Sequence, residues 1–212
     1  MFRRKPLVGI LLFGSLWGFS ECIIGSYLEE IGLPSGSIMT GVFAISILLL
    51  SRLVYRQPGM QIGMSLTAGM LRLFNPFVGC HLCSAIAIMA EGLIFELLWN
   101  TFTMDEVYSY KLASRVSFGI ISAYLLYTMG YIVTQVLTPI IATSSFSAMN
   151  LVATLPKILS QGLPVAFLGG LMTPISLWVA KPHRFTLPDK LYYPVTIGVT
   201  MFCWLTVILS WL

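Results

Sequence analysis

Charged residues inside long apolar stretches are the first candidates for chemistry in this chain. Four such residues stand out: Glu21, Arg72, Glu91 and Glu96. A charge at membrane depth is costly, so it usually faces a cavity or a partner and indicates function. We expect Glu21 and Arg72 at matching depth, where they form either a structural ion pair or a polar anchor for a bound molecule. The predicted substrate-binding residues are Glu21, Arg72 and Glu91, whereas Glu96, nearer a helix end, is expected to reach toward water.

The segment GCHLC, residues 79–83, combines two thiols and an imidazole. Cys80 and Cys83 have C-x-x-C spacing with His81 between them, and such groups can bind a soft metal or take part in redox chemistry. A structural zinc site usually needs four ligands, and the sequence offers no second Cys/His pair. A packed or disulfide-linked hairpin is therefore favoured, and a metal or redox site at Cys80, His81 and Cys83 stays open as an alternative.

Small residues recur every four positions along one side of the first apolar stretch, at Gly14, Gly18 and Cys22. A helix face without bulky side chains lets another helix approach closely. The pattern allows two interpretations. The face is packed within the same bundle, or it is a docking surface for a partner membrane subunit, with Gly14, Gly18 and Cys22 as the docking residues.

Motifs of soluble enzymes are missing from the sequence. It has no Gly-rich phosphate loop, no nucleophile elbow and no HExxH pattern. We therefore expect no enzymatic activity and no cofactor, so that any ATP hydrolysis falls to a partner. Basic residues do not interleave with aromatic ones in any run, so we expect no nucleic-acid partner either.

The composition indicates the kind of element that positions these residues. The chain has 212 residues, of which 57% are hydrophobic and 9% are charged. Soluble domains carry about 25% charged residues. So much apolar surface exceeds what one core can bury, and the lipid bilayer must cover the rest. We predict a single integral membrane domain over residues 1–212, all-α and polytopic.

Seven apolar stretches approach the roughly 20 residues that a helix needs to cross a bilayer. They are residues 6–27, 37–55, 60–77, 80–99, 114–138, 158–180 and 192–212. The third and fourth are expected to form a tight hairpin. The sequence thus predicts a bundle of about seven transmembrane helices.

The basic residues predict the orientation of this bundle. When the N-terminus is placed in the cytoplasm, all of the twelve Lys and Arg residues except Arg72 and Lys157 lie at cytoplasmic ends or loops, which makes ten. Such an excess on one side follows the positive-inside rule. We therefore predict seven spans with a cytoplasmic N-terminus.

Residues 9–98 resemble the substrate-binding S components of energy-coupling factor transporters. The resemblance rests on LWGFSE in the first helix, on a Pro-Gly turn before the second, and on an Asn-Pro turn that leads into AIAIMAEGLIFELL. It implies a multi-pass protein of the bacterial plasma (inner) membrane that binds a small ligand in the outer half of the bundle. It also implies that Gly14 and Gly18 dock a coupling subunit. The family usually has six helices, so one of the seven here is an addition.

Three functions remain as hypotheses. The favoured one is a substrate-binding subunit of a vitamin or metabolite importer, which captures its ligand from the outer face and docks other integral membrane subunits together with an ATPase module. The second is a structural or accessory subunit of a larger membrane complex, for example a redox complex. The third is metal transport or redox chemistry through the thiols and imidazole of residues 80–83.

Overall fold

The computed structural model describes residues 4–74, 81–141, 148–180 and 189–210, and all regular structure in these ranges is helical. The elements, in chain order, are α1 (Arg4–Phe19), η1 (Ser20–Ile24), α2 (Gly25–Glu30), α3 (Ser35–Ile38), η2 (Met39–Ala44), α4 (Ile45–Tyr55), α5 (Met60–Leu73), α6 (His81–Trp99), α7 (Met104–Ser109), α8 (Leu112–Ile141), α9 (Ala148–Val179) and α10 (Asp189–Leu209). The all-α prediction is confirmed for these residues.

Six helical stretches in the described part of the chain are long and apolar enough to cross a membrane. They are Lys5–Glu30, Ser35–Tyr55, His81–Trp99, Leu112–Ile141, Leu151–Val179 and Leu191–Leu209. This confirms a polytopic membrane protein. The third of the seven predicted spans, residues 60–77, begins as expected at Met60, but the helix there, α5, has only 14 residues. It is about 21 Å long, less than the roughly 30 Å of a bilayer core, so the count of seven is not confirmed.

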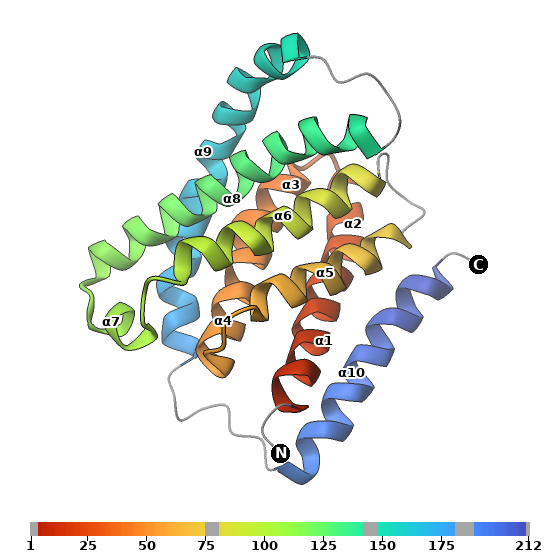
Figure 1. The fold of residues 1–212 in the computed structure, drawn as a ribbon, viewed down its shortest axis with the longest axis vertical. Helices are drawn as coiled ribbons and strands as arrows, with labels where there is room; N and C mark the ends of the chain where they lie inside the picture. Colours follow the sequence, from red (N-terminus) through yellow and green to blue (C-terminus); the bar gives the residue numbers. More distant parts are fainter. Residues whose placement is uncertain (1–3, 75–80, 142–147, 181–188, 211–212) are drawn as a thin grey trace.

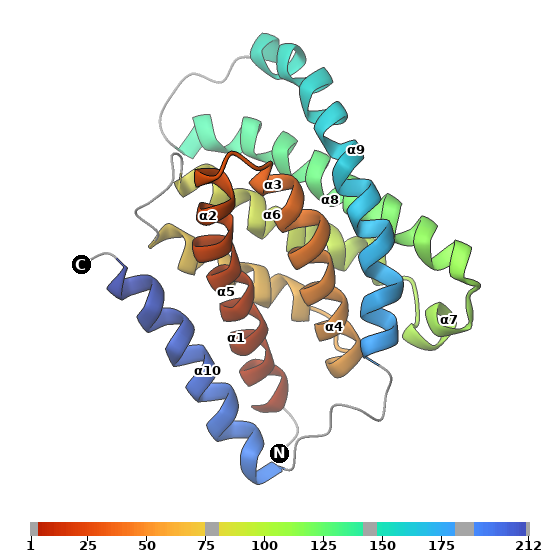
Figure 2. The ribbon, with the colours of Figure 1, turned by 180° about the vertical axis from the view of Figure 1, so that it is seen from behind.

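The helices run back and forth between two ends of the bundle (Figure 1). Helix α5 packs between α1 and α6, α8 lies against α6, and α9 pairs with α8. Helix α10 lies at the edge beside α1, and α9 lies on the opposite side, as both ribbon views show (Figures 1 and 2). At one end, the Tyr192 hydroxyl contacts the Tyr55 hydroxyl and donates to the Lys5 carbonyl, which joins the adjoining ends of α1, α4 and α10.

Helices α8 and α9 cross in direct backbone contact. A Cβ placed on Gly169 would lie 2.2 Å from the Ala123 Cβ, and one on Gly119 would lie 2.5 Å from the Gly169 carbonyl oxygen. Small residues at such crossings let the two backbones approach closely. The close approach strengthens the van der Waals packing that holds membrane helices together. The longest hairpin of the molecule is therefore specified by two glycines and an alanine.

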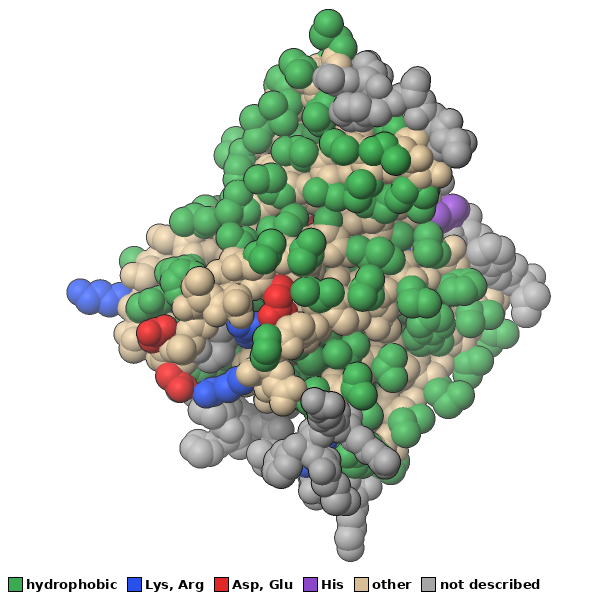
Figure 3. All heavy atoms as spheres, in the orientation of Figure 1, with side chains coloured by type: hydrophobic (Ala, Val, Ile, Leu, Met, Phe, Trp, Pro, Cys, Tyr) green, Lys and Arg blue, Asp and Glu red, His purple; other side chains and the backbone are tan. Residues whose placement is uncertain are grey.

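The outer surface separates apolar from charged regions. Large apolar side chains on α9 and α10 are exposed, among them Phe167 at 66% and Phe202 at 63%, as expected of side chains that contact lipid. Charged side chains gather instead at the edge near α7 (Figure 3). There Arg56, which ends α4, pairs with Asp105 at 3.2 Å. One end of the bundle thus carries a charged rim.

Candidate functional site

Two π-helical turns interrupt otherwise continuous membrane helices. The turn η1 joins α1 to α2 and carries Glu21, and η2 joins α3 to α4 and carries Thr40. A π turn adds one residue to a helical turn, is rare, and occurs frequently at functional sites. The extra residue changes the direction in which neighbouring side chains project. Both π turns contribute to the wall of the same cavity.

The cavity has a volume of about 190 Å³ and lies between η1, the α3–η2 segment, α6 and α8. Glu21 of η1 and Gly36 of α3 belong to its wall, so the cavity lies near the turn between α2 and α3, and Figure 2 shows that this turn is distant from α7. Its polar wall residues are Glu21, Thr40, Ser84, Glu91, Tyr131 and Thr134. The structure thus brings two of the three predicted binding residues, Glu21 and Glu91, to one space.

Glu91, on α6, is 5% exposed and only half satisfied. The Thr40 hydroxyl donates to its Oε1 at 2.7 Å. Its Oε2 is buried and has no hydrogen-bond partner among the described residues. A buried carboxyl oxygen without a partner costs free energy, because it has lost water and gained nothing in return. The ionised form of Glu91 is therefore costly at this position, and a hydrogen-bond donor at Oε2 would stabilise it.

Glu21, on η1, is the second carboxyl group of the cavity wall. The Trp17 indole N–H donates to its Oε1 at 3.3 Å. Trp17 itself is fully buried, so this contact holds the Glu21 side chain from inside the bundle. Glu21 and Glu91 therefore bring two carboxyl groups to the wall of one cavity.

Arg72, the third predicted residue, is buried on α5 but is not part of the cavity wall. Its Nη1 donates to the Glu21 main-chain carbonyl at 2.8 Å, and its Nε donates to the Ser84 hydroxyl at 3.0 Å. Within the described part of the chain, Arg72 forms no ion pair with the Glu21 carboxylate, although their charges are close enough to interact. Through these hydrogen bonds Arg72 positions the π turn and Ser84, although Arg72 is not itself a residue of the cavity wall.

The thiol and imidazole candidates are only partly described. Cys83 lines the cavity and is disulfide-bonded, a state in which its sulfur is not a thiolate ligand. His81 begins α6, and its Nδ1 is buried without a hydrogen-bond partner in the described ranges. Cys80 lies outside the described residues. No three His, Cys, Asp or Glu side chains of the described residues are grouped for metal binding, and the metal or redox site stays a prediction.

The small-residue face of α1 is covered by α5 of the same chain. A Cβ on Gly14 would lie 2.7 Å from the Met64 carbonyl oxygen, and one on Gly18 would lie 3.0 Å from that of Ala68. The Cys22 thiol contacts the Leu71 carbonyl at 3.8 Å. The predicted docking residues therefore lie inside the bundle, because α5 fills the space that their small side chains leave. A partner would have to displace α5 to reach them.

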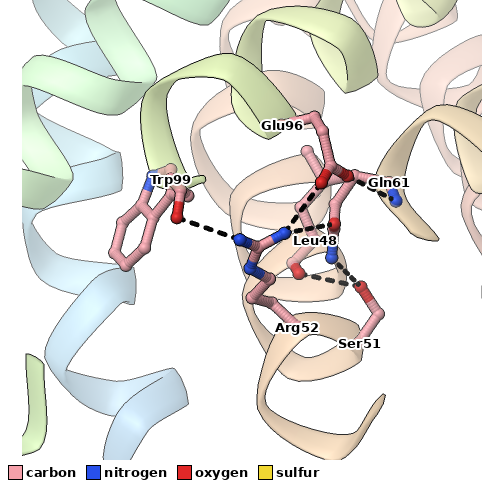
Figure 4. A network of polar contacts seen from close by, with 6 residues as sticks. All are labelled: Leu48, Ser51, Arg52, Gln61, Glu96 and Trp99. Carbon is pink, nitrogen blue, oxygen red and sulfur yellow. Dashed lines mark hydrogen bonds and ion pairs between the residues drawn. The ribbon is translucent and has the colours of Figure 1, made fainter. Parts of the chain in front are cut away.

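Glu96 is buried, at 6% exposure, contrary to the expectation that it reaches water. The reason is Arg52, at the end of α4, whose Nη1 lies 2.9 Å from Glu96 Oε1 (Figure 4). The second oxygen, Oε2, accepts the Gln61 main-chain N–H at 3.2 Å. The same guanidinium also donates to the Gln61 side chain and to the Trp99 carbonyl.

This Arg52–Glu96 network ties together α4, α5 and α6, and both oxygens of Glu96 have donors. A buried ion pair whose remaining groups are hydrogen-bonded is a structural element that needs no ligand. Residue types alone pointed to Glu96 but not to Arg52, because Arg52 was assigned to a helix end exposed to water.

Four polar wall residues of the cavity were not predicted: Thr40, Ser84, Tyr131 and Thr134. The available signal was weak, because hydroxyl groups inside apolar stretches are common and usually bond the backbone of their own helix. Thr134 does so, since its hydroxyl donates to the Tyr131 carbonyl at 2.7 Å. Thr40 departs from this pattern by bonding Glu91, which is 51 residues away.

Comparison of the chain with models of known protein families, with curated proteins and with solved structures gives no match.

Proposed function

We propose that this chain is the substrate-binding membrane subunit of a small-molecule importer and holds its ligand in the cavity lined by Glu21 and Glu91. The proposal rests mainly on Glu91, which lines a space of about 190 Å³ and has a buried Oε2 without a hydrogen-bond partner among the described residues. The Arg52–Glu96 network shows that the bundle satisfies a buried carboxylate fully where it serves structure alone. An incompletely satisfied carboxyl group on a cavity wall is typical of a binding site.

The cavity volume favours a small metabolite over a large vitamin. Ligand sites for drug-sized molecules usually enclose about 300–1,000 Å³. A cavity of about 150 Å³ accepts benzene, so the present cavity suits a ligand of roughly that size or slightly larger.

The proposal includes the orientation with a cytoplasmic N-terminus and counts α5 as a seventh crossing. It is supported by the basic side chains of Arg56, Lys111 and Arg115, which belong to the end of the bundle where α4 stops and α8 starts. By the positive-inside rule, this end faces the cytoplasm. The cavity then opens toward the outer half of a bacterial plasma membrane, where an importer meets its substrate.

Partner subunits remain part of the proposal, including an ATPase module. Since α5 covers Gly14 and Gly18, docking would use another face. The outer face of α10 is available, because only 17% of its apolar window is buried within the chain. Lipid or a partner covers this face.

The test is mass spectrometry of the gently solubilised native complex, which reports bound ligand and partners together. We expect a small molecule to copurify with the wild type and with Glu29→Gln, an exposed carboxylate at the cavity end of the bundle. We expect Glu21→Gln and Glu91→Gln to lose it while still inserting into the membrane.

Equal ligand content in all four proteins would contradict the cavity as the binding site. A stable large assembly without any ligand would favour an accessory subunit of a larger complex. Metal bound to the wild type and lost in Cys80→Ser would favour metal transport, whereas identical, near-zero metal content in both would end that alternative.

A further inference from the structure

We infer that the ligand of this cavity is a small organic cation, an ammonium or amidinium compound whose charged nitrogen lies between Glu21 and Glu91. This inference rests on the proposed function and adds the class of substrate to it. Three features of the cavity support it: the two acidic residues of the wall, the Glu91 oxygen that has no hydrogen-bond partner among the described residues, and the apolar side chains that make up the rest of the wall.

The described wall of the cavity carries two acidic groups and no basic one. Glu91 is 95% buried, by the 5% exposure given above, and its Oε2 lacks a partner within the described ranges. The nearest buried cation, Arg72, directs its hydrogen bonds to the Glu21 carbonyl and to Ser84. A positive ligand would remove the repulsion between the two carboxylates and would supply the missing partner.

Two of the four hydroxyl groups of the wall donate elsewhere, and no described hydroxyl group donates to Glu91 Oε2. Thr40 donates to Glu91 Oε1, and Thr134 donates to the Tyr131 carbonyl. The ionised Glu91 carboxylate can accept a further hydrogen bond at Oε2. The ligand must therefore bring a hydrogen-bond donor, and a charged N–H donor makes a stronger hydrogen bond to a carboxylate than a neutral N–H or O–H donor does.

The rest of the wall favours an organic body over a bare metal ion. Met39, Ala87 and Ile88 contribute carbon surface, and the Tyr131 ring is a surface on which a cation can lie. No three acidic, Cys or His side chains in the described part of the chain are grouped as metal ligands. By comparison with the benzene cavity, the space accommodates roughly 6–10 non-hydrogen atoms.

The experiment compares three benzyl or phenyl probes of similar size, which are benzylamine, benzyl alcohol and benzoate, and uses MnCl₂ as an inorganic cation. Binding to the purified full-length chain in lipid nanodiscs is measured by isothermal titration calorimetry. The double variant Glu21→Gln/Glu91→Gln serves as the control, because it lacks both carboxylates and any remaining signal measures partition of the probe into the lipid. We expect benzylamine to bind the wild type and Glu29→Gln equally, and Glu91→Gln to bind it at least about tenfold more weakly, since a buried charge pair is lost.

Equal affinity for benzyl alcohol and benzylamine would overturn the cationic class while leaving a small-molecule cavity, and with it the proposed function, in place. Glu91-dependent binding of Mn²⁺ without binding of benzylamine would overturn the organic class. If no probe binds and no ligand copurifies with the native complex, both the inference and the proposed function are wrong. If circular dichroism and gel filtration show that Glu91→Gln does not fold, Glu21→Gln replaces it, and we expect the same loss of benzylamine affinity in that variant.

Discussion

Glu91 and Glu96 lie on the same helix, α6, and differ in what their carboxyl oxygens contact. Both oxygens of Glu96 meet donors, one of them the Arg52 guanidinium. Glu91 has the Thr40 hydroxyl on Oε1 and no described partner on Oε2. Burial of a charged side chain indicates that both residues have a specific role. Only their contacts show that the role of Glu96 is structural and that Glu91 is a candidate for binding.

We predict that Glu96→Gln strongly destabilises the protein. It leaves the Arg52 charge buried without its partner, which costs about 3–5 kcal/mol for a buried pair. The measurement is the apparent melting temperature in detergent, with the exposed Glu29→Gln as control. The double variant Arg52→Gln/Glu96→Gln should recover part of the loss, because no uncompensated charge remains. A Glu96→Gln protein that melts at the wild-type temperature would contradict the structural role of the pair.

The candidate site was predictable at the level of single residues but not of contacts. Glu21 and Glu91 follow from the rule that charges within apolar stretches face cavities or partners, and the structure brings them to one cavity. The pairing of Arg52 with Glu96 joins residues 44 positions apart, and hydropathy carries no information on such pairs.

At the scale of elements, hydropathy indicated where membrane helices lie but not how they end or deform. Helix α5 stops at Leu73, short of the predicted boundary at residue 77. The π turns η1 and η2 each insert one residue into a continuous apolar helix, which leaves the hydropathy profile unchanged. The small-residue face of α1 was recognised, but its neighbour, α5, became known only from the structure.

The short helix α7, outside the membrane spans, provides a prediction on pH. Its capping box joins Thr103 and Glu106: the Thr103 N–H donates to Glu106 Oε2, and the Glu106 N–H donates to the Thr103 hydroxyl. The bond from the Thr103 backbone lowers the pKa of Glu106. Because the pKa of Glu106 is lower in the folded state, its ionised carboxylate stabilises the capping box. This stabilisation is complete above the ordinary glutamate pKa of about 4.3, and it is lost as the pH falls through the lowered pKa.

We therefore expect hydrogen–deuterium exchange over residues 103–109 to be slower in the wild type than in Glu106→Gln at neutral pH. The two proteins should become alike at acidic pH, once Glu106 is protonated. Comparison at each pH removes the intrinsic pH dependence of exchange. A difference that persists unchanged in acid would show that the carboxylate charge does not stabilise the capping box.

At the scale of the whole molecule, the number of crossings decides on which sides of the membrane the two ends of the chain lie. Six crossings would put both ends on the same side, and seven, with α5 included, put them on opposite sides. We predict seven, with a cytoplasmic N-terminus. A fluorescent-protein fusion and an alkaline-phosphatase fusion at each end measure this directly. Cytoplasmic signals from both ends would show that α5 does not cross.

The Arg52–Glu96 network also has a consequence for the order in which the chain enters the bilayer. Arg52 is synthesised 44 residues before the carboxylate that pairs with it in the folded protein. An unpaired guanidinium is costly in lipid, so the end of α4 must wait at the water boundary while α5 and α6 leave the ribosome. The hydrogen bonds from Arg52 to Glu96, Gln61 and Trp99 then close together. We therefore expect the end of α4 to reach its final depth only after α6 has been inserted.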